Sequence, residues 1–70
     1  MAAEIEFRSL DSRGEEILNQ LERKTGERGE RGLNGARTYS LLGAKVGTDG
    51  FDAMLDKIDS SWASHLSRTP

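Results

Sequence analysis

Few residues in this chain have the types and spacing that enzyme chemistry requires. His65 is the only histidine and there is no cysteine, so a nucleophile paired with a base would have to combine His65 with a serine or an aspartate. The nearby serines lie in the segment SSWASHLS (residues 60–67), where they are only neighbours along one expected helix. We therefore expect no catalytic residue. We interpret His65 as a partly exposed side chain in the last helical turn, where the helix dipole favours its protonated form.

A row of aspartates in the C-terminal third has helical spacing. Steps of three, four and three positions would place them on one side of a helix, and they are Asp49, Asp52, Asp56 and Asp59. Carboxylates are ligands for hard cations, but a straight helix does not supply a converging set of oxygens, and the pattern of an EF-hand loop is absent. We interpret the row as an acidic interaction surface and expect no metal site.

The glycine-rich segment GAKVGTDG (residues 43–50) precedes this expected helix and contains a lysine. Such a segment can bind phosphate when it has the P-loop ending Gly-Lys-Ser/Thr or the glycine spacing of a dinucleotide-binding turn. It has neither, so we expect a simple loop and no bound cofactor.

A second glycine-rich segment, GERGERGLNG (residues 26–35), has a glycine at every third position. It lacks the prolines and the many triplets of collagen, and a glutamate stands beside each Arg-Gly arginine, unlike in an Arg/Gly nucleic-acid tract. The stretch from residue 23 to 37 carries a net charge of +3, so the rest of the chain carries −5. Its basic residues are Arg23, Lys24, Arg28, Arg31 and Arg37. We interpret residues 26–35 as a charged loop, with these five residues as a basic interaction surface.

The elements that must position these residues follow from hydrophobic periodicity. An apolar stripe with steps of four, three, four and four predicts a helix over residues 50–67, and it consists of Phe51, Leu55, Ile58, Trp62 and Leu66. Asp49 is the expected N-cap, and Trp62 is expected to anchor the core.

A first helix is predicted from Arg13 to Lys24. Ser12 and Glu15 have the spacing of a capping box, and Gly26 is placed as a left-handed C-cap. Before this helix, Ile5 and Phe7 alternate with charged residues, which indicates a half-buried strand. The alternative is one long helix from the N-terminus to Lys24, but the poor helix formers between residues 9 and 14 favour a strand followed by a helix.

Residues 36–42 indicate a second strand, because Asn34-Gly35 suits a hairpin turn and Thr38 and Tyr39 favour strands. The alternative is a short helix, which would make the protein a three-helix, all-α domain. We favour a single small α+β domain over residues 1–70, ordered strand, helix, loop, strand, helix, with two amphipathic helices on a very small sheet.

Size and composition set the wider expectations. With no cysteine and no apolar run approaching the roughly 18 residues of a membrane span, we expect a soluble, cytoplasmic protein. Because a two-stranded sheet is marginal in water, we also expect self-association.

These observations favour a small interaction or regulatory protein without catalytic activity, which binds a protein partner or another copy of itself. The alternative is a nucleic-acid-associated protein that places its five basic residues on phosphates. Glu27 and Glu30 would repel phosphates beside the arginines that attract them, so we favour a protein partner.

Overall fold

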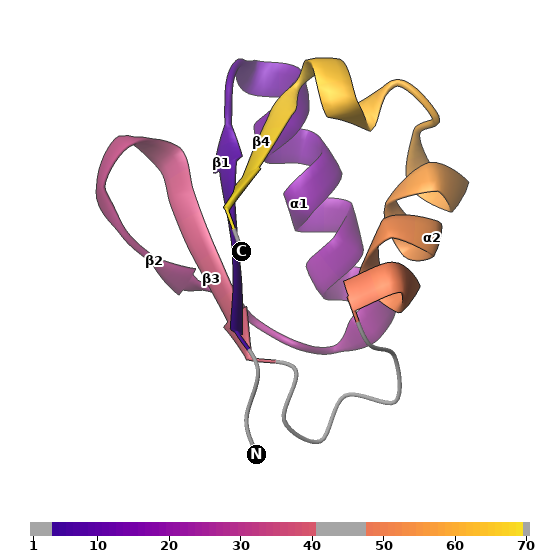
Figure 1. Cartoon of the computed structure of the whole chain (residues 1–70), viewed down its shortest axis with the longest axis horizontal. Coiled ribbons are helices and arrows are strands. Elements are labelled where there is room, and N and C mark those ends of the chain that lie inside the picture. The colour runs from indigo at the N-terminus through magenta and orange to yellow at the C-terminus, as the bar shows by residue number, and fades with distance from the viewer. Residues whose placement is uncertain (1–3, 41–47, 70) are drawn as a thin grey trace.

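The structure is a computed structural model that describes residues 4–40 and 48–69. Its elements, drawn in Figure 1, are β1 (Glu4–Ser9), α1 (Ser12–Thr25), β2 (Glu30–Arg31), a 3₁₀ turn (Leu33–Gly35), β3 (Ala36–Ser40), α2 (Thr48–Ile58), a second 3₁₀ turn (Trp62–Ser64) and β4 (Leu66–Thr69).

The strands form one four-stranded antiparallel sheet in the order β2-β3-β1-β4. Both helices lie on the same side of this sheet, so within the described residues no helix covers its other, open face (Figure 1). The β-α-β-β-α-β element order is that of a split β-α-β, or ferredoxin-like, arrangement. The predicted α+β class is confirmed, and the all-helical alternative is not adopted. The sheet is larger than expected, with four strands where the sequence indicated two.

The strand predicted before the first helix is confirmed as β1. Its alternation is the reason, because Ile5 and Phe7 are buried toward the helices while the residues between them point to the open face. Ile5 pairs with Tyr39 of β3, and the Phe7 ring packs edge-on against the Tyr39 ring, with centroids 6.1 Å apart. The single long helix considered for this region is therefore excluded.

Helix α1 has the predicted C-cap but a different N-cap, and it extends one residue beyond the predicted bounds at each end. Gly26 has the left-handed φ of 74° and donates its N–H to the carbonyl of Glu22 at 2.8 Å, as expected for a C-cap. The predicted capping box is wrong, because the N-cap is Asp11, which accepts a hydrogen bond from the Gly14 N–H at 2.9 Å. Aspartate caps as well as serine does, and Glu15 is thereby left to contact the sheet.

The predicted turn before the second strand is confirmed. Asn34 and Gly35 both have positive φ angles, 58° and 73°, and the Ala36 N–H closes the turn on the carbonyl of Leu33. The expected loop 26–35 is not irregular throughout, however, because its residues Glu30–Arg31 form strand β2. Strand β3 covers Ala36–Ser40, while residues 41 and 42 of the expected strand lie outside the described residues.

The long C-terminal helix predicted over residues 50–67 is wrong. Helix α2 ends at Ile58, and the carboxylate of Asp59 accepts hydrogen bonds from the N–H and the hydroxyl of Ser61, which supports a turn in place of another helical turn. The chain then returns as β4, and Leu66 enters the core from a strand paired with β1.

The N-terminal boundary of α2 also differs from the prediction. The helix already includes Thr48–Gly50, so Asp49 lies within its first turn instead of preceding it as an N-cap. The remainder of the predicted glycine-rich loop, residues 43–47, lies outside the described residues.

A single hydrophobic core fills the space between the sheet and the two helices. Its buried members are Ile5, Phe7, Ile17, Leu18, Leu21, Tyr39, Phe51, Leu55 and Leu66. Trp62 is only half-buried at the edge of this core, where its ring packs edge-on against Phe7, and its indole N–H is held by Asp56 at 2.7 Å. In the described part of the chain, neither helix is both long enough and apolar enough to cross a bilayer.

Candidate functional site: a charged pocket between α1 and β2

The five basic residues singled out in the sequence differ in how available they are. Arg37 lies on the helix-facing side of β3 and is only 5% exposed. Arg31 on β2 is bound to Glu22. The other three, Arg23 and Lys24 in the last turn of α1 and Arg28 in the connection to β2, are exposed and have no ion-pair partner among residues 4–40 and 48–69.

Arg37 is held by three side chains of α1. One terminal nitrogen donates to the amide oxygen of Asn19 at 2.8 Å and to the Glu22 carboxylate at 3.1 Å. The other donates to the Glu15 carboxylate at 2.7 Å, and Glu15 also accepts a hydrogen bond from the Ser9 hydroxyl. We interpret this guanidinium as structural, because it is buried and three of its five N–H donors are already bound to side chains of α1.

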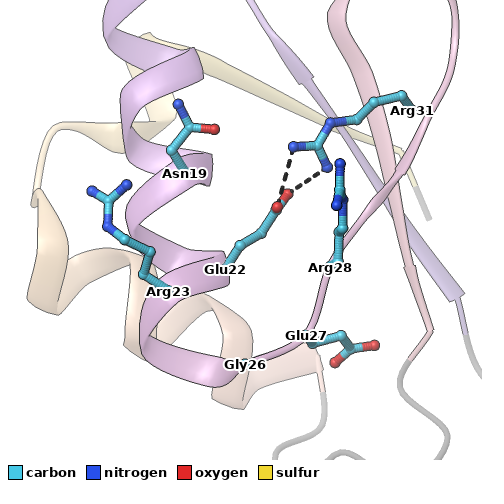
Figure 2. A pocket seen from close by; sticks show the side chains of 7 residues that line it. All are labelled: Asn19, Glu22, Arg23, Gly26, Glu27, Arg28 and Arg31. Carbon is cyan, nitrogen blue, oxygen red and sulfur yellow. Dashed lines mark hydrogen bonds and ion pairs between the residues drawn. The ribbon is translucent and has the colours of Figure 1, made fainter.

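Glu22 is the centre of the same network. Besides the hydrogen bond from Arg37, it accepts one from the hydroxyl of Tyr39 at 2.6 Å. Both terminal nitrogens of Arg31 also donate to it, at 2.8 and 3.2 Å (Figure 2). Arg31 also donates to the carbonyl of Gly29 at 2.7 Å. The network therefore contains two arginines and two glutamates and is neutral as a unit.

The environment keeps these groups in their ordinary charge states. Burial acts to raise the pKa of Glu22, but the hydrogen bonds from Tyr39 and Arg31 outweigh it and lower the pKa. The hydrogen bonds from Ser9 and Arg37 likewise lower the pKa of Glu15. Burial and the nearby Glu22 carboxylate raise the pKa of Tyr39. Both carboxylates stay ionised and the phenol stays neutral near neutral pH, so Glu22 is a poor proton acceptor.

A pocket of about 300 Å³ lies between the C-terminal end of α1 and the segment leading into β2 (Figure 2). Its lining residues are Asn19, Glu22, Arg23, Gly26, Glu27, Arg28 and Arg31. In Figure 2 the side chain of Arg28 points toward the Glu22–Arg31 pair, Arg23 extends from α1 at the outer side, and the carboxylate of Glu27 points away from the pair. Two guanidinium groups are therefore directed to one place, and one of them has no acceptor of its own in the described structure.

Gly29 sets the path of the segment that carries these arginines. It is buried, and a Cβ atom at this position would lie 2.7 Å from the Tyr39 ring. The backbone between Arg28 and Glu30 can approach the ring this closely only without a side chain. This contact fixes where Arg28 and Arg31 leave the backbone on either side of the pocket.

The expected acidic row is not a continuous helix face. Asp49 and Asp52 lie on α2, but Asp59 lies beyond its last residue. Asp52 pairs with Arg68 at 2.6 Å, and Asp56 accepts the Trp62 indole N–H. Asp59 accepts from Arg13 at 2.9 Å, and its hydrogen bonds from Ser61 together with Arg13 lower its pKa to about 2. An interaction role for these aspartates stays a prediction.

Two further predictions concern metal binding and His65. Among the described residues there is no group of three or more side chains placed to hold a metal ion. His65 follows a 3₁₀ turn, so the predicted position in a last helical turn is wrong. Its ring nitrogen Nδ1 lies 2.9 Å from the Asp11 carboxylate, and its carbonyl accepts the Leu10 N–H at 2.7 Å. Both contacts join the start of α1 to the start of β4.

The open face of the sheet is polar and largely acidic. Glu4, Glu6 and Arg8 point to it from β1, and Glu6 pairs with Thr38 of β3, which in turn pairs with Glu30 of β2. Among the described residues this face presents no aromatic side chain, since Phe7 and Tyr39 point to the helices. It therefore lacks the stacking platform with which sheets of this topology bind single-stranded RNA.

Comparisons with other proteins do not assign a family or a function to this chain. No protein family model, curated protein or solved structure matches this chain. The arrangement of strands and helices does not decide the matter, because one fold serves many functions. A function has to be argued from the pocket and the charges around it.

Sequence reasoning named the arginines but missed their partners. Glu15, Asn19 and Glu22 recur at intervals of four and three along α1, which places them on one stripe of the helix, and Arg37 and Tyr39 share one side of β3. That spacing was a usable signal for a polar contact between the two elements. Which arginine would be buried depends on how α1 packs on the sheet.

Proposed function

We propose that the protein is a small interaction protein without catalytic activity, and that it binds an acidic segment of a protein partner at the pocket between α1 and β2. The observation that carries this proposal is the position of Arg28, an exposed cation with no acceptor in the described structure, pointing toward a second guanidinium, that of Arg31. A cation without an acceptor attracts an anion, and the second guanidinium beside it adds to the positive potential at this place.

The charges around the pocket support the same partner. The Glu15, Glu22, Arg31 and Arg37 network is neutral, so the surface charge comes from Arg23, Lys24 and Arg28 against Glu27, a net charge of +2. These residues surround the C-terminal end of α1, where cations also complement the helix dipole. A local positive charge on a chain that is acidic elsewhere orients an acidic partner toward the pocket.

Nucleic acid remains the alternative, and the contacts disfavour it. Two of the five basic residues, Arg31 and Arg37, are engaged by glutamates, and Glu27 directly precedes Arg28. Phosphate-based binding needs several free cations along one track, and binding of single strands also uses exposed aromatic rings. Trp62 is half-buried with its indole N–H on Asp56, and Tyr39 is buried.

The proposal also covers catalysis and location. The absence of catalysis is supported by the closed network, in which Glu22 is surrounded by donors and its pKa is lowered. A cytoplasmic location is supported by the absence of cysteine.

The proposal is tested by titrating the full chain with a glutamate-rich peptide and with a neutral peptide of the same length, at low and at physiological salt. We expect the acidic peptide alone to bind, and its affinity to fall as salt screens the charges. Arg28→Gln should weaken binding by up to roughly fivefold, because an exposed ion pair contributes at most about 1 kcal/mol.

Arg8→Gln is the matched control, since Arg8 is an exposed arginine on the open face of the sheet. It should leave the affinity unchanged. Equal losses in both variants, or no binding of the acidic peptide, would overturn the proposal. Sub-micromolar binding of a random single-stranded oligonucleotide at about 0.15 M salt, lost in Arg28→Gln but not in Arg8→Gln, would establish the nucleic-acid alternative instead.

A further inference from the structure

We propose that the group seated in this pocket is a phosphate monoester, carried by a phosphorylated serine or threonine of the partner segment, and that Arg28 and Arg31 hold it together. This inference rests on the proposed function, because it specifies which acidic group the pocket takes. It follows from what Arg31 does in the free protein and from what an incoming anion must displace.

Arg31 already has a carboxylate partner. Its two terminal nitrogens lie 2.8 and 3.2 Å from the two oxygens of Glu22, a paired arrangement that satisfies one edge of the guanidinium. A carboxylate of the partner would offer Arg31 the same chemistry and the same charge that Glu22 offers. A partner carboxylate that replaced Glu22 on Arg31 would therefore gain little free energy, and it would bind mainly through Arg28.

A phosphate monoester differs from a carboxylate in charge and in shape. It carries about −1.5 to −2 charges near pH 7 and three terminal oxygens, so it can accept from two guanidinium groups at once. Arg28 points toward Arg31 and has no acceptor within the described residues. A phosphate between them would offer one terminal oxygen to each arginine and a third oxygen besides, at about 1.5 to 2 times the charge of a carboxylate.

Glu22 does not lose its compensation if Arg31 turns to a ligand. It keeps the Tyr39 hydroxyl at 2.6 Å and Arg37 at 3.1 Å, so its charge remains paired. Arg31 is able to move, since 45% of its side chain is exposed, whereas the Arg37 side chain is 6% exposed and fixed. Arg37 is thus the structural arginine of the network, and Arg31 is the one that can turn from Glu22 to a ligand. Arg31 also lines the pocket.

The pocket has room for such a group. Its volume of about 300 Å³ is at the lower end of the range for small-ligand sites and exceeds what a phosphate alone would fill. Its carboxylates are Glu22, which is already paired, and Glu27, which points away from the arginine pair in Figure 2. All three cations lining the pocket are arginines, the side chains suited to bidentate binding of phosphate oxygens.

The test compares three peptides that differ at one position of an otherwise identical acidic sequence: phosphoserine, glutamate and serine. Each is titrated into the full chain, together with inorganic phosphate as a fourth probe. We expect the phosphoserine peptide to bind about tenfold or more tightly than the glutamate peptide, because its phosphate binds Arg31 in addition to Arg28. The advantage should shrink as the pH falls below about 6, where the phosphate takes up a proton.

The variant Arg31→Gln tests the contribution of Arg31 to the binding of the phosphate. It should lower the ratio of phosphoserine to glutamate affinity to about one, while the glutamate peptide still binds through Arg28. Lys24→Gln is the control, because Lys24 is exposed near the pocket but does not line it. It should weaken both peptides alike and leave the ratio intact. Circular dichroism of both variants checks that the fold is retained.

The outcomes separate this inference from the proposed function. If the phosphoserine and glutamate peptides bind the parent protein equally, the phosphate inference is overturned while the binding of acidic segments stands. If no acidic peptide binds, both fail. Inorganic phosphate binding as tightly as the phosphopeptide would overturn the assignment to a peptide side chain, and an affinity ratio unchanged in Arg31→Gln would overturn the role of Arg31.

Discussion

At the scale of single residues, Glu22 links the stability of the protein to its candidate site. It accepts hydrogen bonds from Tyr39, Arg37 and Arg31, two of which are structural and one of which faces the pocket. A buried pair of this kind adds little net stability over an apolar contact, but removing one partner leaves an uncompensated charge. The network is thus best probed by changing the charge of Glu22 without changing its size.

The first prediction concerns Glu22 and acid. Its pKa is lower in the folded protein than the ordinary 4.5, since the donors from Tyr39 and Arg31 overcome the effect of burial. The folded state therefore binds this proton less readily than the unfolded chain. The stabilisation is fully present above about pH 4.5 and is lost as the pH falls through the lower, folded-state pKa.

The variant Glu22→Gln should accordingly unfold at lower urea concentration than the parent at pH 7, and the difference should narrow between about pH 4.5 and pH 3. Urea titrations followed by circular dichroism across this range measure it. Other carboxylates with lowered pKa values, such as Glu15 and Asp59, are present in both proteins and cancel in the comparison. If the difference in urea midpoint between the two proteins stayed constant down to pH 3, the claim that Glu22 is ionised in the network would be contradicted.

At the scale of elements, α1 and β4 meet at an unusually close contact. Gly14 of α1 is buried, and a Cβ atom at this position would lie 2.3 Å from the carbonyl oxygen of His65, the residue before β4. The same carbonyl accepts the Leu10 N–H, so it is not free to shift away. The missing side chain of Gly14 thus lets the helix lie against the end of the sheet.

Gly14→Ala should therefore destabilise the protein, by about 1–3 kcal/mol from forced repacking. Helix propensity alone predicts the opposite sign, because alanine in a helix interior is better than glycine by about 0.5–1 kcal/mol. Ser12→Ala is the control in the same helix: Ser12 is exposed and Asp11 is the cap, so its effect should stay within about 0.5 kcal/mol. Stabilisation by Gly14→Ala would contradict the packing of α1 on this turn.

The elements also show what the sequence could predict. Alternation identified β1, and the glycine after Lys24 identified the end of α1, because both are local patterns with a single structural meaning. The stripe from Phe51 to Leu66 was misleading. Its members enter the core, or pack at its edge, from a helix, a 3₁₀ turn and a strand, and hydrogen bonds between Asp59 and Ser61 replace the continuing helix.

Strand β2 was missed for a different reason. It has only two residues, Glu30 and Arg31, and both are charged and exposed, so no hydrophobic pattern marks it. Only part of the candidate site was predicted from the sequence. Composition singled out the arginines, but their different environments arise from the packing of α1 on β3. Arg37 is buried, Arg31 is paired with Glu22, and Arg28 has no ion-pair partner in the described part of the chain.

At the scale of the whole molecule, the reason for expecting self-association has changed. It rested on a two-stranded sheet, whereas the sheet has four strands and both helices cover one face. The Cα radius of gyration of 10.8 Å is close to the roughly 11 Å expected for a compact single chain of this length. The oligomeric state stays a prediction, but the four-stranded sheet removes the argument for self-association that a two-stranded sheet supplied.

Sedimentation equilibrium over a wide range of micromolar concentrations should accordingly give the monomer mass of 7.7 kDa. A concentration-dependent dimer would contradict this expectation. The uncovered edges of β2 and β4 would then be the first surfaces to examine, since edge strands are the usual sites of sheet extension.

The distribution of charge over the whole molecule also bears on binding. Glutamates dominate the open face of the sheet, with Glu4 and Glu6 on β1 and Glu30 on β2. Around the end of α1 lie cations that have no ion-pair partner among the described residues. An acidic partner is repelled by the first surface and attracted by the second, so electrostatics should orient its approach. The location of binding is therefore as informative as its strength.

The most direct test of the central claim maps this location. An ¹⁵N-labelled full chain is titrated with the phosphoserine peptide, and the backbone and arginine side-chain signals are followed by NMR. We predict that the changes concentrate between residues 19 and 31, with the Nε signals of Arg28 and Arg31 among the largest. Changes centred on the open face of the sheet, around Glu6 and Thr38, or no changes at saturating peptide, would contradict the account.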